Sequence, residues 1–84
     1  MIITREVNGI PLWLMREYLE ELGGKAKGDH EVAAADWDAR IYKVEDFKLG
    51  SISIGRVRLE LTGEDSVIET LLPRLELKLL RGGG

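Results

Sequence analysis

The segment IPLWLMREYLEELGG, residues 10–24, constrains the fold of this chain more than any other. Its apolar side chains recur at helical spacing and form one stripe, made of Leu12, Met15, Leu19 and Leu22. Pro11 suits the first turn of a helix, where a missing N–H costs nothing, and Gly23-Gly24 is a usual C-terminal signal. The pattern predicts a helix over residues 11–22, preceded by one short strand in MIITREV.

Between residues 30 and 62 the apolar period changes from that of a helix to that of a strand. HEVAAADWDARIYKV predicts one long bent strand or two shorter ones, with Trp37, Ala39 and Ile41 on one face. ISI and RVRLELT also alternate, but the apolar parity flips across Gly55. Because a one-residue slip turns every side chain to the other face, we expect a turn or sharp bend between two strands there. KAKGDH and EDFKLGS are interpreted as connections.

The C-terminal third predicts a second helix that starts in TGEDSVIETLLP. Asp65 or Ser66 can cap it, and Glu69 follows Ser66 at the spacing of a capping box. Pro73 is expected to end or kink this helix. Residues 74–80, RLELKLL, alternate like a strand but also continue a helical apolar spacing, and we favour the strand.

The predicted order is β-α-β-β-β(-β)-α, which defines the fold class as α+β. We expect one domain over residues 1–84, with a single antiparallel sheet, two helices on one of its faces and a flexible glycine tail at 82–84.

Composition excludes several function classes. A net charge of −3 and a pI near 5.1 argue against a nucleic-acid binder that relies on bulk charge. The chain has no cysteine, hence no disulfide and no thiolate site. No apolar run approaches the roughly 20 residues of a membrane span, and MIITREVNG does not have the form of a signal peptide, so we expect a cytoplasmic protein. The scarcity of Asn and Gln beside many Glu, Lys and Arg is typical of thermophile proteins.

The candidates for chemistry are few, and we expect neither an enzyme nor a cofactor. His30 is the single histidine; its neighbours Asp29 and Glu31 alternate along the chain, so the three do not converge on a metal ion. Asp36 and Asp38 are expected on one face of a strand, about 7 Å apart, where they could share acid/base work or hold Mg²⁺. The simpler interpretation is a polar outer face, with Trp37 packed inward on the other side.

The candidate contacts with a protein partner are Trp13, Asp36 and Asp38. Trp13 lies at the start of the first helix, beside the Leu12 end of the apolar stripe. Tryptophan is over-represented at binding hot spots, but packing in the core is the more frequent role and the one we favour for it.

The tail LLRGGG has the form of a carrier tail, in which the carboxylate of a terminal glycine is activated. Glycines suit such a tail because they have no Cβ to clash inside a partner's active site. Gly83 and Gly84 are therefore the candidate carrier residues, against the simpler interpretation of an unstructured end.

The segments REVNG, YLEELGG, ADWDARI, IGRVRLELTG and LKLLRGGG give the chain a resemblance to a known family over nearly its full length. It resembles the domain appended to MoaD-related proteins of thermophilic bacteria and archaea, MoaD being the small subunit of molybdopterin synthase. The resemblance implies a TBP-like order, β-α-β4-α, and an association with molybdenum or tungsten cofactor assembly or with sulfur transfer. It implies no particular reaction. The Gly-Gly carriers themselves, ubiquitin and MoaD, start with a β-hairpin before the helix, for which this chain has no room.

These observations predict a small non-catalytic accessory or interaction domain with a protein partner and no nucleic-acid or membrane partner. A homodimer is a further expectation, because so short a chain has a thin core and an exposed sheet edge is a template for pairing. Two alternatives stay open. One is a sulfur carrier activated at Gly84, and the other is a small-ligand binder that uses the concave sheet face between the two helices.

Overall fold

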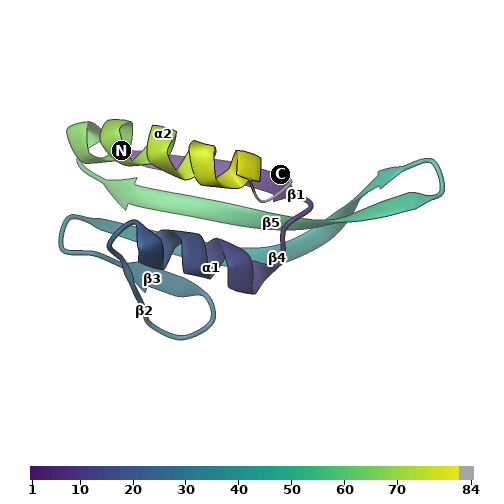
Figure 1. Ribbon diagram of the computed structural model, residues 1–84, viewed down its shortest axis with the longest axis horizontal. Helices are drawn as coiled ribbons and strands as arrows, with labels where there is room; N and C mark the ends of the chain where they lie inside the picture. The colour runs from purple at the N-terminus through teal and green to yellow at the C-terminus, as the bar shows by residue number, and fades with distance from the viewer. Residues whose placement is uncertain (82–84) are drawn as a thin grey trace.

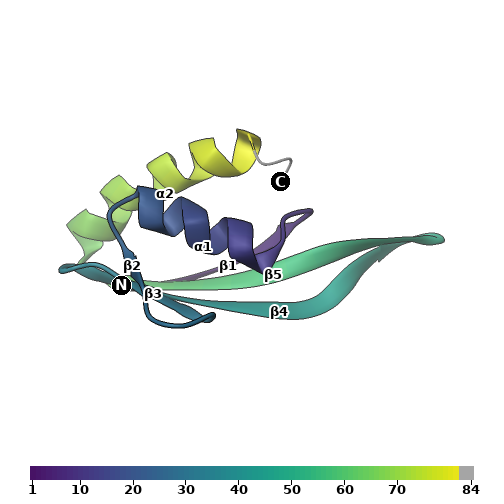
Figure 2. The same cartoon turned by 60° about the horizontal axis from the view of Figure 1, so that its bottom comes forward.

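The computed structural model describes residues 1–81 and contains one antiparallel sheet covered by two helices (Figure 1). The elements in chain order are β1 (Ile2–Asn8), α1 (Leu12–Glu21), β2 (Lys25–Ala26), β3 (Glu31–Ala33), β4 (Trp37–Leu49), β5 (Ile52–Gly63) and α2 (Asp65–Arg81). The five strands lie in the order β1-β5-β4-β3-β2, and both helices pack on the same face of the sheet (Figure 2). The α+β class and the predicted element order are confirmed, with β2 as a short extra strand inside an expected connection.

The core lies between the helices and the sheet. The alternation predicted for the strands is confirmed beneath the helices. There every second residue of β4, from Trp37 to Ile41, and of β5, from Val57 to Leu61, turns inward. The buried side chains come from both layers and are Ile10, Met15, Leu19, Leu22, Val32, Trp37, Ala39, Ile41, Val57, Leu59, Leu61, Ile68, Leu71 and Leu75.

Helix α2 runs without a break through Pro73, so the strand predicted for residues 74–80 is wrong. The segment is helical because a helix places both Leu71 and Leu75 in the core. Leu77, which a strand would have turned to the same side as Leu75, is 62% exposed. Pro73 lies on the exposed side of the helix, where the carbonyl that loses its donor can bond to water.

The turn expected at Gly55 lies instead at Gly50 and Ser51, and Gly50 adopts a φ of +61°. β5 passes straight through Gly55, and the segment EDFKLGS, interpreted as a connection, mostly belongs to β4. The parity flip has a physical cause: the helices do not reach this end of the sheet, so Ile52 and Ile54 turn to the face opposite the core. A β-bulge between Val44 and Phe47 shifts the register by one residue, so that Phe47 pairs with Ile54 and Leu49 with Ile52.

The result is a two-stranded ribbon of β4 and β5 that projects beyond both helices and beyond the end of β1 (Figure 1). We name residues 44–56 the arm and the rest of the described chain the body. The arm accounts for the elongated shape of the molecule, which measures 42 × 24 × 21 Å.

Candidate functional site

The face of the sheet that points away from the helices is uncovered in residues 1–81 (Figure 2). The strand register places its side chains in rows. One row joins Glu6 of β1, Arg58 of β5 and Tyr42 of β4, and the next joins Asn8, Arg56 and Val44. This face is charged over the body and apolar over the arm.

A charged cluster marks the root of the arm. The Glu6 carboxylate accepts bonds from Arg58 Nη2 at 2.8 Å and from Arg56 Nη1 at 3.3 Å. The hydrogen bond from Arg58 holds the pKa of Glu6 below its usual value. Arg56 also donates from Nε to Asn8 Oδ1 at 3.0 Å, and its guanidinium lies 5.2 Å from the centre of the Phe47 ring. These contacts tie β1, β5 and β4 together where the arm leaves the body.

His30 occupies the other side of the uncovered face, next to β4. Its Nδ1 lies 3.0 Å from the Ile41 carbonyl oxygen, and its ring stacks on Tyr42 with the centroids 6.3 Å apart. Glu31 lies beside Asp38, and the contact between the two carboxyl groups raises the pKa of Glu31. Within residues 1–81, no three His, Asp or Glu side chains are grouped closely enough to hold a metal ion.

The structure separates Asp36 from Asp38, so the predicted carboxylate pair on one strand face is wrong. β4 begins at Trp37, and Asp36 therefore lies in the turn before it, outside the strand alternation. Asp38 points to the uncovered face, opposite Ala33 and Thr62 in the register. The expectation that Trp37 packs inward is confirmed, since it is 7% exposed.

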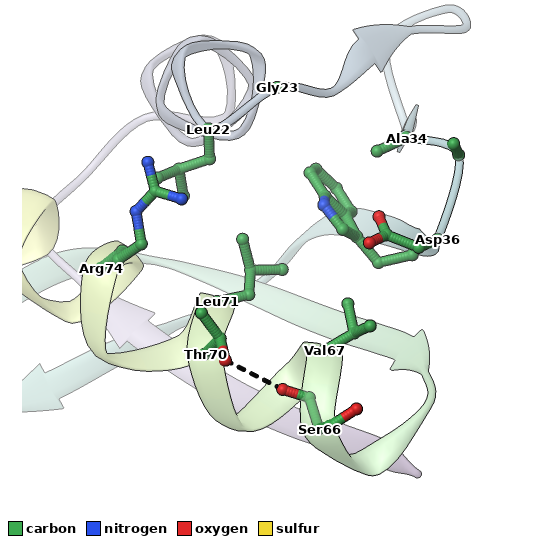
Figure 3. Close-up of a pocket in the computed structure, with 11 residues that line it drawn as sticks. Leu22, Gly23, Ala34, Asp36, Ser66, Val67, Thr70, Leu71 and Arg74 are labelled. Atoms are coloured by element: carbon green, nitrogen blue, oxygen red, sulfur yellow. Dashed lines mark hydrogen bonds between the residues drawn. The ribbon is translucent and has the colours of Figure 1, made fainter.

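Asp36 instead lines an open groove of about 570 Å³ on the helix side of the molecule (Figure 3). The groove lies between the end of α1, the turn before β4 and the first turns of α2. Asp36 lies at one side of the groove, whereas the Arg74 guanidinium points toward Leu22 at the other. Thr70 Oγ donates to the Ser66 carbonyl at 3.0 Å. The polar groups therefore do not converge on one point.

The concave sheet face between the helices, where we considered a small ligand, is filled by side chains. Met15 and Leu19 of α1 and Ile41 and Leu59 of the sheet have no exposed surface. The groove beside Asp36 lies at the rim of this packed layer. This packing argues against a ligand site under the helices.

Trp13 is 55% exposed, so the packing role that we favoured for it is wrong. It lies on α1 outside the stripe of Met15 and Leu19, the two fully buried side chains of the helix. Its exposure leaves it accessible to a partner. The candidate carrier glycines Gly83 and Gly84 lie outside the described residues.

The arm carries four neighbouring apolar side chains on the uncovered face, and the sequence analysis missed them. Leu49 is 62% and Ile52 is 59% exposed, and the two face each other in the register. Phe47 faces Ile54 in the next row, and both are partly exposed. The parity flip at Gly55 was the available signal, since it shows that the apolar residues before and after it belong to different faces.

The opposite side of the arm is polar. Asp46, one of the residues of the bulge, accepts hydrogen bonds from Lys43 Nζ at 2.6 Å and from Ser53 Oγ at 2.8 Å. The hydrogen bond from Lys43 and that from Ser53 lower the pKa of Asp46. These bonds hold the bulge closed and give the arm one apolar and one polar face.

Among residues 1–81, no helix has both the length and the apolar character that a membrane crossing requires. No curated protein matches the chain. The family model described as "Archaeal MoaD-like protein" matches residues 3–84, which is nearly the whole sequence and agrees with the resemblance to MoaD-related proteins. The chain therefore belongs to the archaeal MoaD-like protein family.

Proposed function

We propose that this chain is a non-catalytic interaction domain that serves molybdopterin synthesis or sulfur transfer by binding a protein partner. The observation that carries the proposal is the apolar face of the arm, where Leu49 and Ile52 are each more than half exposed. Membership in the MoaD-like family supports the link to that chemistry.

The arm has the properties of a docking element. Isolated two-stranded ribbons are marginally stable in water, and this one exposes four apolar side chains on one face: Phe47, Leu49, Ile52 and Ile54. Burying a side chain such as Leu or Ile fully contributes about 1.5–3 kcal/mol, so covering this face would stabilise both the arm and a complex.

The charged cluster at the root supplies the polar border of this surface. Arg56 and Arg58 both donate to the Glu6 carboxylate, so the three side chains are ordered before a partner binds. Apolar centres bordered by polar groups are the usual composition of protein interfaces. Side chains that are held in place before binding also lose less entropy on association.

We propose a MoaD-type carrier of the same organism as the partner. The test is a calorimetric titration of that carrier with the wild-type chain and with a Leu49→Ser/Ile52→Ser variant. The variant is expected to bind at least about tenfold more weakly, because two apolar anchors are lost.

Leu77→Ser is the matched control, since Leu77 has the same 62% exposure as Leu49 but lies on α2, which packs on the opposite face of the sheet. It is expected to leave the affinity unchanged. No binding by the wild-type chain, or an equal loss in the control, would contradict the proposal.

A second candidate, a sulfur carrier activated at Gly84, is favoured by one observation: the family match extends through residues 82–84. Its test is incubation of the chain with a MoaD-activating enzyme and ATP, followed by mass spectrometry. An adenylate on the Gly84 carboxylate is the expected product, and a chain without Gly83 and Gly84 is the control. We rank this candidate second because it is supported by the family match alone, whereas the first is also supported by the exposed apolar face of the arm.

A further inference from the structure

The two edges of the arm differ in how they are protected. Beyond Ile41, whose N–H bonds to the His30 carbonyl, the outer edge of β4 is unpaired among the described residues. That edge carries a bulge and four charged side chains: Lys43, Glu45, Asp46 and Lys48. Charges and bulges are the devices by which natural proteins prevent pairing at strand edges.

The outer edge of β5 has none of these devices between Ile52 and Ile54. β1 ends at Asn8, opposite Arg56, and the Gly9 N–H closes the ladder on the Gly55 carbonyl at 2.8 Å. Beyond that point β5 has no neighbour on this side within residues 1–81, and the stretch Ile52-Ser53-Ile54 contains no charge, no proline and no bulge.

Ser53 presents its backbone groups to this open edge. The Gly55 carbonyl points toward the β1 side, as does the Gly63 N–H, which bonds to the Met1 carbonyl. Backbone groups of alternate residues in a strand point to the same side, so those of Ser53 point away from β4. Its side chain is engaged separately, by the bond from Oγ to Asp46.

We propose that this edge binds a second copy of the chain, with the two β5 strands antiparallel about a twofold axis at Ser53. In this register Ser53 of each copy donates its N–H to the Ser53 carbonyl of the other. Ile52 of one copy faces Ile54 of the other on the apolar side, and the paired stretch stops before Gly55, whose carbonyl already accepts the Gly9 N–H. Such an isologous contact is closed and self-complementary.

The length of the open edge selects this register. The pairing stretch is bounded by the turn at Gly50 and Ser51 and by the bond from the Gly9 N–H to the Gly55 carbonyl, which leaves Ile52, Ser53 and Ile54 open. Its midpoint is Ser53. A twofold axis moved one residue toward the body would place Ile52 of one copy against Arg56 of the other, where Asn8 already pairs.

Pairing also joins the apolar faces of the two arms. Each row would then run across four strands, from Phe47 and Ile54 of one copy to Ile52 and Leu49 of the other. Cross-strand apolar pairs of this kind are the units that stabilise sheets. The contact is smaller than a standard interface of roughly 800 Å² per partner, so we expect a weak dimer that forms at high micromolar concentration.

The first experiment is sedimentation of the full chain at concentrations up to about 1 mM. At such concentrations even a contact smaller than a standard interface gives a measurable fraction of dimer. The wild-type chain is expected to dimerise. Ser53→Pro removes the outward N–H and keeps the backbone bonds to β4, and it is expected to weaken the dimer at least about tenfold. It also removes the side-chain bond to Asp46, so Ser53→Ala, which loses that bond but keeps the N–H, is measured beside it and is expected to dimerise like the wild type. A folded spectrum by NMR is required of each variant.

Lys48→Pro is the matched control, because Lys48 faces Ser53 in the register and its backbone groups point to the other edge of the arm. It is expected to keep the wild-type dissociation constant. A wild-type chain that stays monomeric, a Ser53→Pro dimer of unchanged affinity or an equal loss in Lys48→Pro each overturns the proposal.

The second experiment uses the absence of cysteine from the chain. The Cα atoms of a hydrogen-bonded antiparallel pair are about 5.5 Å apart, which is within the range of a disulfide. Ser53→Cys is expected to form a disulfide-linked dimer under mild oxidation, and Lys48→Cys is not. Cross-linking that is faster in Lys48→Cys would place the contact on the β4 edge and refute the proposal.

The dimer and the proposed partner binding can fail separately. Ser53→Pro leaves the apolar side chains of Leu49 and Ile52 in place, whereas Leu49→Ser/Ile52→Ser leaves the backbone edge in place. Partner binding lost only in the second variant is therefore independent of the dimer.

Discussion

Strands β4 and β5 pass through two environments, and the contrast between them explains most of this molecule. In the body, one face of each strand lies under the helices, and its inward residues, such as Ile41 and Leu59, have no exposed surface. In the arm the same two strands leave the helices behind, and the apolar residues change faces. Strand pairing is therefore common to both regions, but only the body has a core.

The contrast teaches that the two faces of one sheet can carry different functions. The covered face of the body holds the fold together, while the uncovered face of the arm is free to bind. Substitutions that compare matched positions in the two regions can break or sharpen this distinction.

The largest expected effect is loss of core packing. Leu59→Ala is expected to lower the free energy of unfolding by about 2–5 kcal/mol, because it removes a fully buried side chain and leaves a cavity. Leu49→Ala in the arm is expected to change it by less than about 0.5 kcal/mol. Urea unfolding of both variants at one low protein concentration measures the difference, and equal losses would show that the arm belongs to the core.

The second comparison uses two glycines. A Cβ at Gly24 would lie 2.5 Å from Val32 Cγ1 and 2.6 Å from Trp37 Cη2, so Gly24→Ala is expected to destabilise the fold by about 1–3 kcal/mol. A Cβ at Gly55, in the arm, meets nothing within 4 Å. Gly55→Ala is expected to be neutral or stabilising by up to about 1 kcal/mol. Thermal unfolding of the pair checks both signs, and destabilisation by Gly55→Ala would mean that the arm is more tightly packed than we describe.

The third comparison uses two carboxylates with lowered pKa values, Glu6 in the body and Asp46 in the arm. The folded pKa of Glu6 lies below its usual value of 4.5, so its bond to Arg58 adds stability above that pH and loses it as the pH falls through the lowered pKa. The urea midpoint of Glu6→Gln is therefore expected below that of the wild type at pH 7, with the two converging as the pH falls.

Asp46→Asn is expected to act locally, because the arm can open without the body unfolding. Amide exchange of Ile52 and Ile54, whose backbone groups face β4, should quicken in this variant, while the urea midpoint stays near that of the wild type. A global loss of stability in Asp46→Asn would contradict the separation of the two regions.

The smallest expected effect concerns Glu31, whose pKa is raised by the neighbouring Asp38. A raised folded pKa means that the contact favours folding at pH values below 4.5 and that this contribution is lost as the pH rises through the folded pKa. Glu31→Gln should therefore raise the urea midpoint slightly at pH 7, with no such gain at low pH. Asp38→Asn should shift it in the same direction, and a lower midpoint in both would refute the contact.

Prediction from sequence succeeded where one signal acted alone. A helix was identified by the stripe of Met15 and Leu19, and a strand by the alternation of Trp37, Ala39 and Ile41. In each segment the apolar residues fit only one period, that of a helix or that of a strand. Prediction failed at residues 74–80, where two periods fitted equally well and only packing against the sheet could choose between them. It failed again at Asp36, because the start of β4 one residue later removed it from the strand alternation.

Local pattern by itself thus determined the α+β class, the general order of the elements and part of the core, such as Met15, Leu19, Ile41 and Leu59, since burial of an apolar stripe or face is decided by spacing along the chain. It also carried the resemblance that the family match confirmed. The tertiary structure alone decided which face of the sheet stays open, that β4 and β5 continue past the helices and that the β5 edge is bare. Those features depend on the lengths of the elements relative to one another. The spacing of side chains within one element does not determine where its neighbours end.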